Sequence, residues 1–185
     1  MLKSNRVNND AIKIDFRSIT FSDIPLMFQW FNTPHVQKFY SLRSWTEEEV
    51  LAKLAPYICG DKPVSGFIIS LDENPIGYLQ SYQVSDYPWP NQNLAEEIVR
   101  SAMGMDLFIG NEGLLGKGLG QQIIRTFIEA HVCPQYRYCI VDPDLRNVRA
   151  IQCYRKLKFK EHQVIDTEDA LQHPTKLMLM IIKCA

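Results

Sequence analysis

The sequence predicts an α/β protein, with a mixed, mostly antiparallel central sheet flanked by helices on both faces. Its 185 residues, 46% hydrophobic and 22% charged, fit one domain with a sizeable core. In the first half, apolar residues alternate or cluster in short runs, as in a meander of strands. In the second half, strand-like runs alternate with stretches of helical periodicity, which places helices against a mixed sheet.

The first half begins with a strand and two capped helices. Alternating apolar and polar residues over 12–19 predict a half-buried strand. Thr20 or Ser22 can cap the next helix, in which Ile24, Met27 and Phe31 share one side. Thr46, followed three residues later by glutamate, predicts a capping box and a helix to residue 58. A buried strand at 66–71, a turn at 72–75 and a second strand at 76–82 form a hairpin.

The second half follows an irregular loop at 83–97, which holds two prolines and Trp89. Apolar runs predict strands, and 3.6-residue periodicity predicts helices between them. The expected strands are 103–109, 136–141, 159–165 and 176–182, and the expected helices are 116–132 and 146–157. We expect one domain over 12–185, preceded by a flexible N-terminus at 1–11.

Composition excludes several classes of protein. A formal net charge of −1 argues against nucleic acid as the main partner, and no apolar run approaches a membrane span. The polar N-terminus lacks a signal sequence, which predicts a cytoplasmic protein. Five widely spaced cysteines predict reduced, mostly buried thiols, with neither a disulfide framework nor a zinc site. The four histidines lack the spacing of metal ligands, so we expect no metal.

A glycine-rich turn between a strand and a helix is the strongest functional signal. Gly116, Gly118 and Gly120 let the chain turn tightly and leave N–H groups uncovered at a helix N-terminus, which suits a phosphate. A P-loop is excluded because Asn111 stands where its first glycine belongs, and the Gly-x-Gly-x-Gly spacing is not that of a Rossmann fingerprint. A phosphorylated cofactor is therefore expected, with a ligand-free loop as the alternative.

Two motifs resemble those of the GNAT N-acetyltransferase superfamily. The segment 116–120, Gly-Lys-Gly-Leu-Gly, matches its pyrophosphate loop, and residues 142–159, Asp-Pro-x-x-x-Asn-x-x-Ala-Ile-x-Cys-Tyr-x-Lys-x-x-Phe, match its closing strand and helix. Within the superfamily the chain is similar to the aminoglycoside 6'-N-acetyltransferases through segments 76–82, 104–109 and 115–120. Leu115 stands where the superfamily often has Gln or Arg, and segments 94–102 and 168–174 depart from the pattern.

The resemblance implies direct transfer of an acetyl group from acetyl-CoA to a primary amine. It implies that Asp106 binds the acceptor and removes its proton, and that Tyr154 returns a proton to the leaving thiolate. A strand-end aspartate and a core aromatic residue are the structural alternatives. The residues implied to bind the cofactor are Leu107, Phe108, Ile109, Leu115, Gly116, Lys117, Gly118, Leu119, Gly120, Asn147 and Tyr154. If these two residues do not bind the cofactor, Lys117 is a solvated lysine and Asn147 is a helix cap.

The acceptor is expected to be a small-molecule amine, most simply an aminoglycoside. Asp142 ends a strand at the same sheet edge as Asp106, and two carboxylates attract a polycation. Three acidic residues of the loop region either add to that field or are solvated: Asp86, Glu96 and Glu97. Three aromatic residues either stack on sugar faces or pack internally: Tyr78, Tyr82 and Trp89.

Two other functions stay open. The first is acetylation of another amine, either an N-hydroxylysine siderophore precursor or a protein amine. The second is a non-catalytic acyl-CoA-binding regulator, against which the joint presence of Asp106 and Tyr154 argues. The protein is expected to be a monomer or homodimer.

Overall fold

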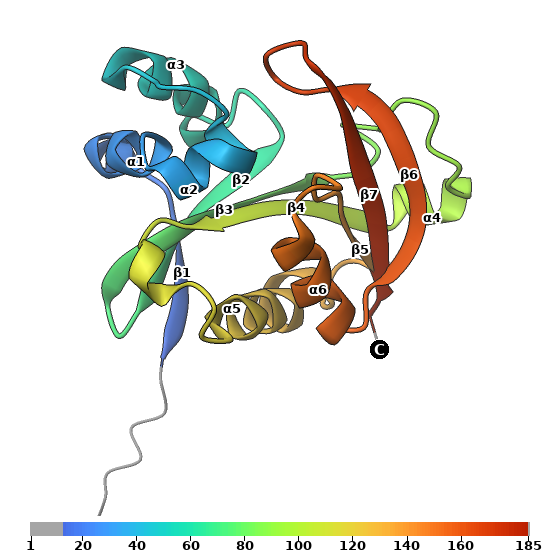
Figure 1. Ribbon diagram of the computed structural model, residues 1–185. Helices are drawn as coiled ribbons and strands as arrows, with labels where there is room; N and C mark the ends of the chain where they lie inside the picture. The colour runs from blue at the N-terminus through green and yellow to red at the C-terminus, as the bar shows by residue number, and fades with distance from the viewer. Residues whose placement is uncertain (1–12, 185) are drawn as a thin grey trace, which may run out of the picture.

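The computed structural model, described here for residues 13–184, contains a seven-stranded sheet in the order β1-β2-β3-β4-β5-β7-β6 (Figure 1). Only β4 and β5 run parallel, so the expected mixed, mostly antiparallel sheet is confirmed. The expected flexible segment 1–11, with residue 12, lies outside the described residues. The strands are β1 Ile14–Ser18, β2 Val64–Leu71, β3 Asn74–Gln83, β4 Ala102–Ile109, β5 Tyr138–Val141, β6 Lys160–Glu168 and β7 Pro174–Lys183.

Helices cover both faces of the sheet, as expected. α1, α2 and α3 lie over one face, and α5 and α6 lie over the other (Figure 1). The helices are α1 Ile24–Phe31, α2 Pro34–Val36, α3 Glu47–Ile58, α4 Glu96–Arg100, α5 Leu119–Phe127 and α6 Val148–Lys156. Short 3₁₀ turns occur at Phe21–Asp23 and Glu112–Leu114, and π-helical turns at Gln37–Ser41 and Ile128–Val132. The helix expected over 116–132 is therefore α5 followed by a π turn, and α2 and α4 were not anticipated.

The capping box of α3 is formed as the sequence predicts. The Glu49 amide donates to Thr46 Oγ1 at 3.2 Å, and the Thr46 amide donates to Glu49 Oε2 at 2.8 Å. These two bonds satisfy amides that the first turn of a helix leaves without partners. They fix the start of the helix that packs on the face of the sheet carrying Phe108.

Strand β4 sends its side chains into different cores on its two faces. Met105 and Ile109 pack with α5 and α6 on one face. On the other face, Phe108 joins the core under α1 and α3, and Ala102 joins a smaller core that contains Trp89. Because side chains alternate along a strand, Asp106 lies on this second face between two apolar cores.

β4 and β5 separate part-way along the sheet. Their pairing covers only Ala102–Gly104 against Tyr138–Ile140, whereas β4 keeps β3 as its partner through Ile109. β5 instead continues along β7, and the Met178 amide donates to the carbonyl of Pro143 at 2.9 Å. The backbone edge of β4 beyond residue 104 is consequently without a strand partner among the described residues.

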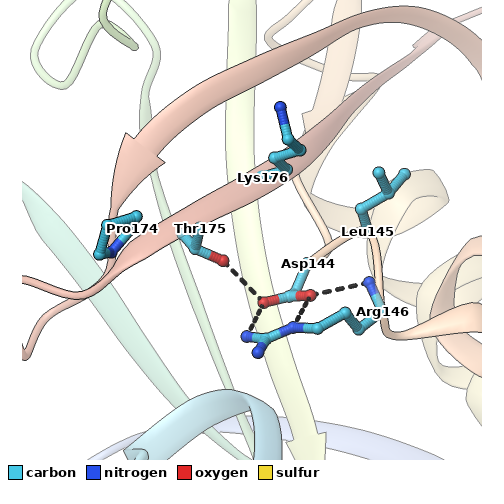
Figure 2. Close-up of a pocket in the computed structure, with 6 residues that line it drawn as sticks. All are labelled: Asp144, Leu145, Arg146, Pro174, Thr175 and Lys176. Atoms are coloured by element: carbon cyan, nitrogen blue, oxygen red, sulfur yellow. Dashed lines mark hydrogen bonds and ion pairs between the residues drawn. The ribbon is translucent and has the colours of Figure 1, made fainter.

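The loop after β5 is fastened to β7 by Asp144. Figure 2 shows its carboxylate between the guanidinium of Arg146, at 2.6 and 2.9 Å, and the hydroxyl of Thr175, at 2.9 Å. An isolated bridge between Asp144 and Leu177 adds to this attachment. The loop that carries Asp142 and leads to α6 therefore follows β7 and diverges from β4.

The expectation that all five cysteines are reduced thiols is wrong. Cys133 and Cys184 form a disulfide with a Cα–Cα separation of 5.2 Å, whereas Cys59, Cys139 and Cys153 are free. The pair is 51 residues apart in sequence, so spacing gave no indication of it. The fold brings the end of the α5 region beside the end of β7.

No helix within residues 13–184 is long and apolar enough to cross a membrane. In the same range, no group of three or more His, Cys, Asp or Glu side chains is arranged to hold a metal ion.

Candidate active site

The glycine turn adopts a conformation that exposes its backbone. Gly116 and Gly118 have φ values of +77° and +79°, in the left-handed region that favours glycine. Gly118 is the N-cap of α5. Gly120 differs from the expectation, because it lies within α5 and has no positive φ. Two glycines, and not three, therefore make the turn.

The amides of this turn are available to a ligand. None of the five amides from Gly116 to Gly120 donates a hydrogen bond to another residue in the range 13–184. The first amide bonds of the helix start later, from Gln121 to the Gly118 carbonyl at 3.1 Å. Free amides at the N-terminus of a nine-residue helix form an anion site suited to a pyrophosphate.

A Gly118→Asp substitution should abolish binding of acetyl-CoA while the protein stays folded. An added Cβ at Gly118 meets nothing within 4 Å, and aspartate adopts a positive φ more readily than most residues, so the fold should tolerate the strain. The carboxylate would occupy and repel the phosphate position. Gly60→Asp is a matched control, because Gly60 has φ +78° and equally open surroundings. Calorimetry measures the acetyl-CoA affinity of both variants. Unchanged affinity in the Gly118 variant would contradict the assignment of the loop.

Two carboxyl groups meet beside the open edge of β4. Asp106 pairs with Gln80 across β3 and β4, and Gln80 Nε2 donates to Asp106 Oδ2 at 2.9 Å. Asp142 directly follows β5, and Trp89 Nε1 donates to Asp142 Oδ2 at 2.6 Å. The two carboxyl groups lie close enough for each to shift the pKa of the other.

Burial disfavours the charged form of both groups. Burial and the charge of Asp106 raise the pKa of Asp142 far above the usual carboxyl range. Burial also raises the pKa of Asp106, but the bond from Gln80 and the charge of Lys53 lower it in part. The pair therefore ionises less readily than two independent carboxyl groups, and its negative charge is smaller than the sequence suggested.

Tyr154 lies on α6 close to this pair. Its ring is 7% exposed and packs edge-on against Phe159, with ring centres 5.3 Å apart. Burial and the nearby charges of Asp106 and Asp142 raise the pKa of Tyr154 well above the usual value for a phenol. The hydroxyl therefore keeps its proton at neutral pH.

Asn147 serves as the N-cap of α6. Its Oδ1 accepts from the Ala150 amide at 3.2 Å, which is the structural alternative anticipated for this residue. The side-chain nitrogen Nδ2 of Asn147 donates to no residue between 13 and 184, whereas the backbone amide donates to the Asp144 carbonyl at 2.8 Å. Its predicted contact with the cofactor stays a prediction.

The family of the chain is established by comparison. A model of the acetyltransferase (GNAT) domain matches residues 20–167. The chain belongs to the GNAT acetyltransferase family. As a GNAT enzyme it is an acetyl-CoA-dependent N-acetyltransferase, and acetyl-CoA is its cosubstrate.

Similar sequences and structures are known for this GNAT protein. Aminoglycoside N(6')-acetyltransferase type 1 of Klebsiella pneumoniae is 30% identical over 178 residues, which cover 90% of this chain and 84% of that protein; the Serratia marcescens protein of the same name gives the same values. The structure of aminoglycoside acetyltransferase AAC(6')-Ib with coenzyme A has a TM-score of 0.79 and 25% identity, covering 92% of this chain and 95% of that one. The same protein with paromomycin and acetyl-CoA has a TM-score of 0.80, also at 25% identity, and covers 92% and 93%.

The three aromatic residues expected to stack on sugars lie in different environments in this GNAT fold. Tyr78 is fully buried, 6.0 Å from the ring of Phe108, so the expectation that it stacks on a ligand is wrong. Trp89 is 9% exposed and binds Asp142 through its indole N–H. Tyr82 is half-buried, with its ring 5.4 Å from that of Tyr87, and remains a candidate contact.

The wider acidic field is weaker than anticipated. Glu96 forms an ion pair with Arg100, and Glu97 forms one with Arg137, all at the exposed surface. Their charges are therefore largely balanced locally. Asp86 is exposed on the loop after β3.

Two polar residues of the site were missed by sequence reasoning. Gln80 lies within the segment 76–82 that resembles the aminoglycoside enzymes, and its position opposite Asp106 could have been inferred from hairpin register. Lys53, whose charge acts on Asp106, lies on α3 at a position without any motif.

Proposed function

We propose that this GNAT enzyme transfers the acetyl group to the 6'-amine of aminoglycosides. The observation that carries the proposal is the Asp106 carboxyl, held by Gln80 beside the open edge of β4, where a cationic amine finds a counter-charge and a proton acceptor. The names of the similar proteins from Klebsiella pneumoniae and Serratia marcescens support the choice of acceptor.

Backbone groups form most of the surface that would bind the cofactor. When bound, acetyl-CoA supplies a thioester carbon that a neutral amine attacks. The amides at Gly116–Gly120 would hold the pyrophosphate, and Lys117, which is exposed, offsets part of its charge. The edge at Leu107, Phe108 and Ile109 lacks a strand partner, although His35 Nε2 contacts the Ile109 carbonyl at 2.9 Å. This edge would bind the pantetheine arm as an added strand and direct an N–H at the thioester oxygen.

Two side chains carry out the proton transfers. Asp106 accepts the proton that the acceptor ammonium must lose before it attacks. Gln80 holds the Asp106 carboxyl in place, and Trp89 orients the neighbouring Asp142. Tyr154 keeps a proton on Oη that it donates to the departing sulfur.

Neomycin and paromomycin test the proposal, because they differ only in having an amine or a hydroxyl at the 6' carbon. We expect thiol release from acetyl-CoA with neomycin and none above background with paromomycin. NMR of the neomycin product should locate the acetyl group on the 6' nitrogen. Equal turnover of both drugs, or acetylation at another nitrogen, would contradict the proposed position. Turnover of only an N-hydroxylysine or peptide amine would contradict the acceptor class.

Acetyl-CoA is an intracellular metabolite, and for that reason we propose that the reaction takes place in the cytoplasm.

A further inference from the structure

Helix α3 borders the face of the sheet that carries Asp106. Val50 and Leu54 are fully buried and share a core with Phe108, two residues beyond Asp106 on the same face of β4. Lys53 and Tyr57 lie one helical turn apart on α3, beside this contact. Lys53 precedes the buried Leu54, so it flanks the row of α3 side chains that packs on this face of the sheet, and its charge and that of Asp106 act on each other.

Lys53 is a cation without a carboxylate partner. Its Nζ lies 6.0 Å from the centre of the Trp45 ring, and it forms no ion pair or hydrogen bond within residues 13–184. The side chain is half-buried. Burial lowers the pKa of Lys53, an effect increased by Lys62 and opposed by Asp106. A partly desolvated ammonium group with free donors therefore lies on the helix that borders the face carrying Asp106.

We propose that Lys53 is a specificity-determining residue that disfavours acceptors carrying a second ammonium group near the reacting amine and favours those with a hydroxyl there. This proposal rests on the proposed aminoglycoside function. The reacting ammonium becomes neutral when it gives its proton to Asp106, so Lys53 repels it only until that transfer. A second ammonium stays charged beside Lys53, whereas a hydroxyl oxygen accepts a hydrogen bond from Nζ.

Kanamycin A and kanamycin B provide a matched pair of substrates. They differ only at the 2' carbon of the sugar that bears the 6'-amine, where kanamycin A has a hydroxyl and kanamycin B an amine. Slightly below neutral pH, where that amine is protonated, the wild type should show the higher kcat/KM for kanamycin A. Lys53→Met should shift the kcat/KM ratio toward kanamycin B by about tenfold, the size of one cation pair across a partly hydrated cleft.

Two variants control for charge and for position. Lys53→Arg keeps the charge and should leave the preference for kanamycin A in place. Lys38→Met removes a lysine that also lies over an aromatic ring, 5.3 Å from the centre of Phe39, but that is exposed on another segment. It should leave the ratio unchanged. In wild type the preference should also shrink as the salt concentration rises.

The outcomes separate this proposal from the proposed function. An unchanged kanamycin ratio in Lys53→Met, with both drugs acetylated, would overturn the role of Lys53 alone. If the wild type acetylates neither kanamycin, the aminoglycoside function fails. The simple pair 3-aminopropanol and 1,3-diaminopropane then decides the role of Lys53, and an equal wild-type rate with both amines would overturn it.

Discussion

An Asp106→Asn enzyme is expected to lose roughly 10³-fold in kcat/KM for an aminoglycoside, within the range typical of a lost general base. The amide is nearly isosteric, and β4 remains paired with β3. The amide accepts no proton from the acceptor and brings no charge to attract it. Steady-state kinetics measures the loss, and calorimetry should show acetyl-CoA affinity close to that of wild type.

Ionic strength provides a second readout for the same residue. The acceptor KM of the wild type should rise with salt, because a charge attraction is screened, and the KM of the Asn variant should respond less. Asp15→Asn, at an exposed position of β1, is the control for removal of a surface carboxylate. Wild-type turnover in the Asp106 variant would show that this aspartate is only a structural residue of the strand.

Tyr154→Phe is expected to lower kcat by roughly 10²- to 10⁴-fold, as for loss of a general acid. The ring and its edge-on contact with Phe159 are kept, so stability and acetyl-CoA affinity should change little. Only the hydroxyl proton is removed. Single-turnover measurements on a confirmed acceptor isolate this effect from product release.

Tyr138→Phe is the matched control for this variant. Tyr138 is half-buried at the start of β5, away from the part of β4 that lacks a strand partner. Its hydroxyl has no part in the proposed reaction, so the rate should be unchanged. A Tyr154→Phe rate close to that of wild type would instead leave Tyr154 as a packing residue.

Local sequence signals predicted much of the fold. The capping box at Thr46, the hairpin around the turn 72–75 and the glycine turn before α5 each depend on a few neighbouring residues, and all three are present. Strand β4 was found from its apolar run, within one residue at its start. Short elements such as α2 and α4 were missed because three to five residues carry too little periodicity.

The environment of single side chains was harder to predict. Tyr78 lies in an apolar core because successive side chains of β3 point to opposite faces of the sheet. A shift of one residue in the register would move its side chain to the other face. Asp106 and Asp142 were expected at one sheet edge, but the rise in the pKa of both groups depends on their burial, which the sequence does not show. The bond from Trp89 to Asp142 crosses 53 residues of sequence and belongs to no local pattern.

The backbone edge of β4 and its two rows of side chains have different roles. Its backbone edge is the proposed binding surface for acetyl-CoA, and one row of its side chains packs under α5. The opposite row holds Asp106, the proposed contact of the acceptor, between two apolar cores. Substitutions in the acceptor-facing row, in α3 or in the loop after β3 leave the donor's backbone contacts untouched. Related enzymes can therefore change their acceptor amine by successive substitutions while their affinity for acetyl-CoA stays constant. The choice of acceptor is thus the property of the enzyme that evolves most readily.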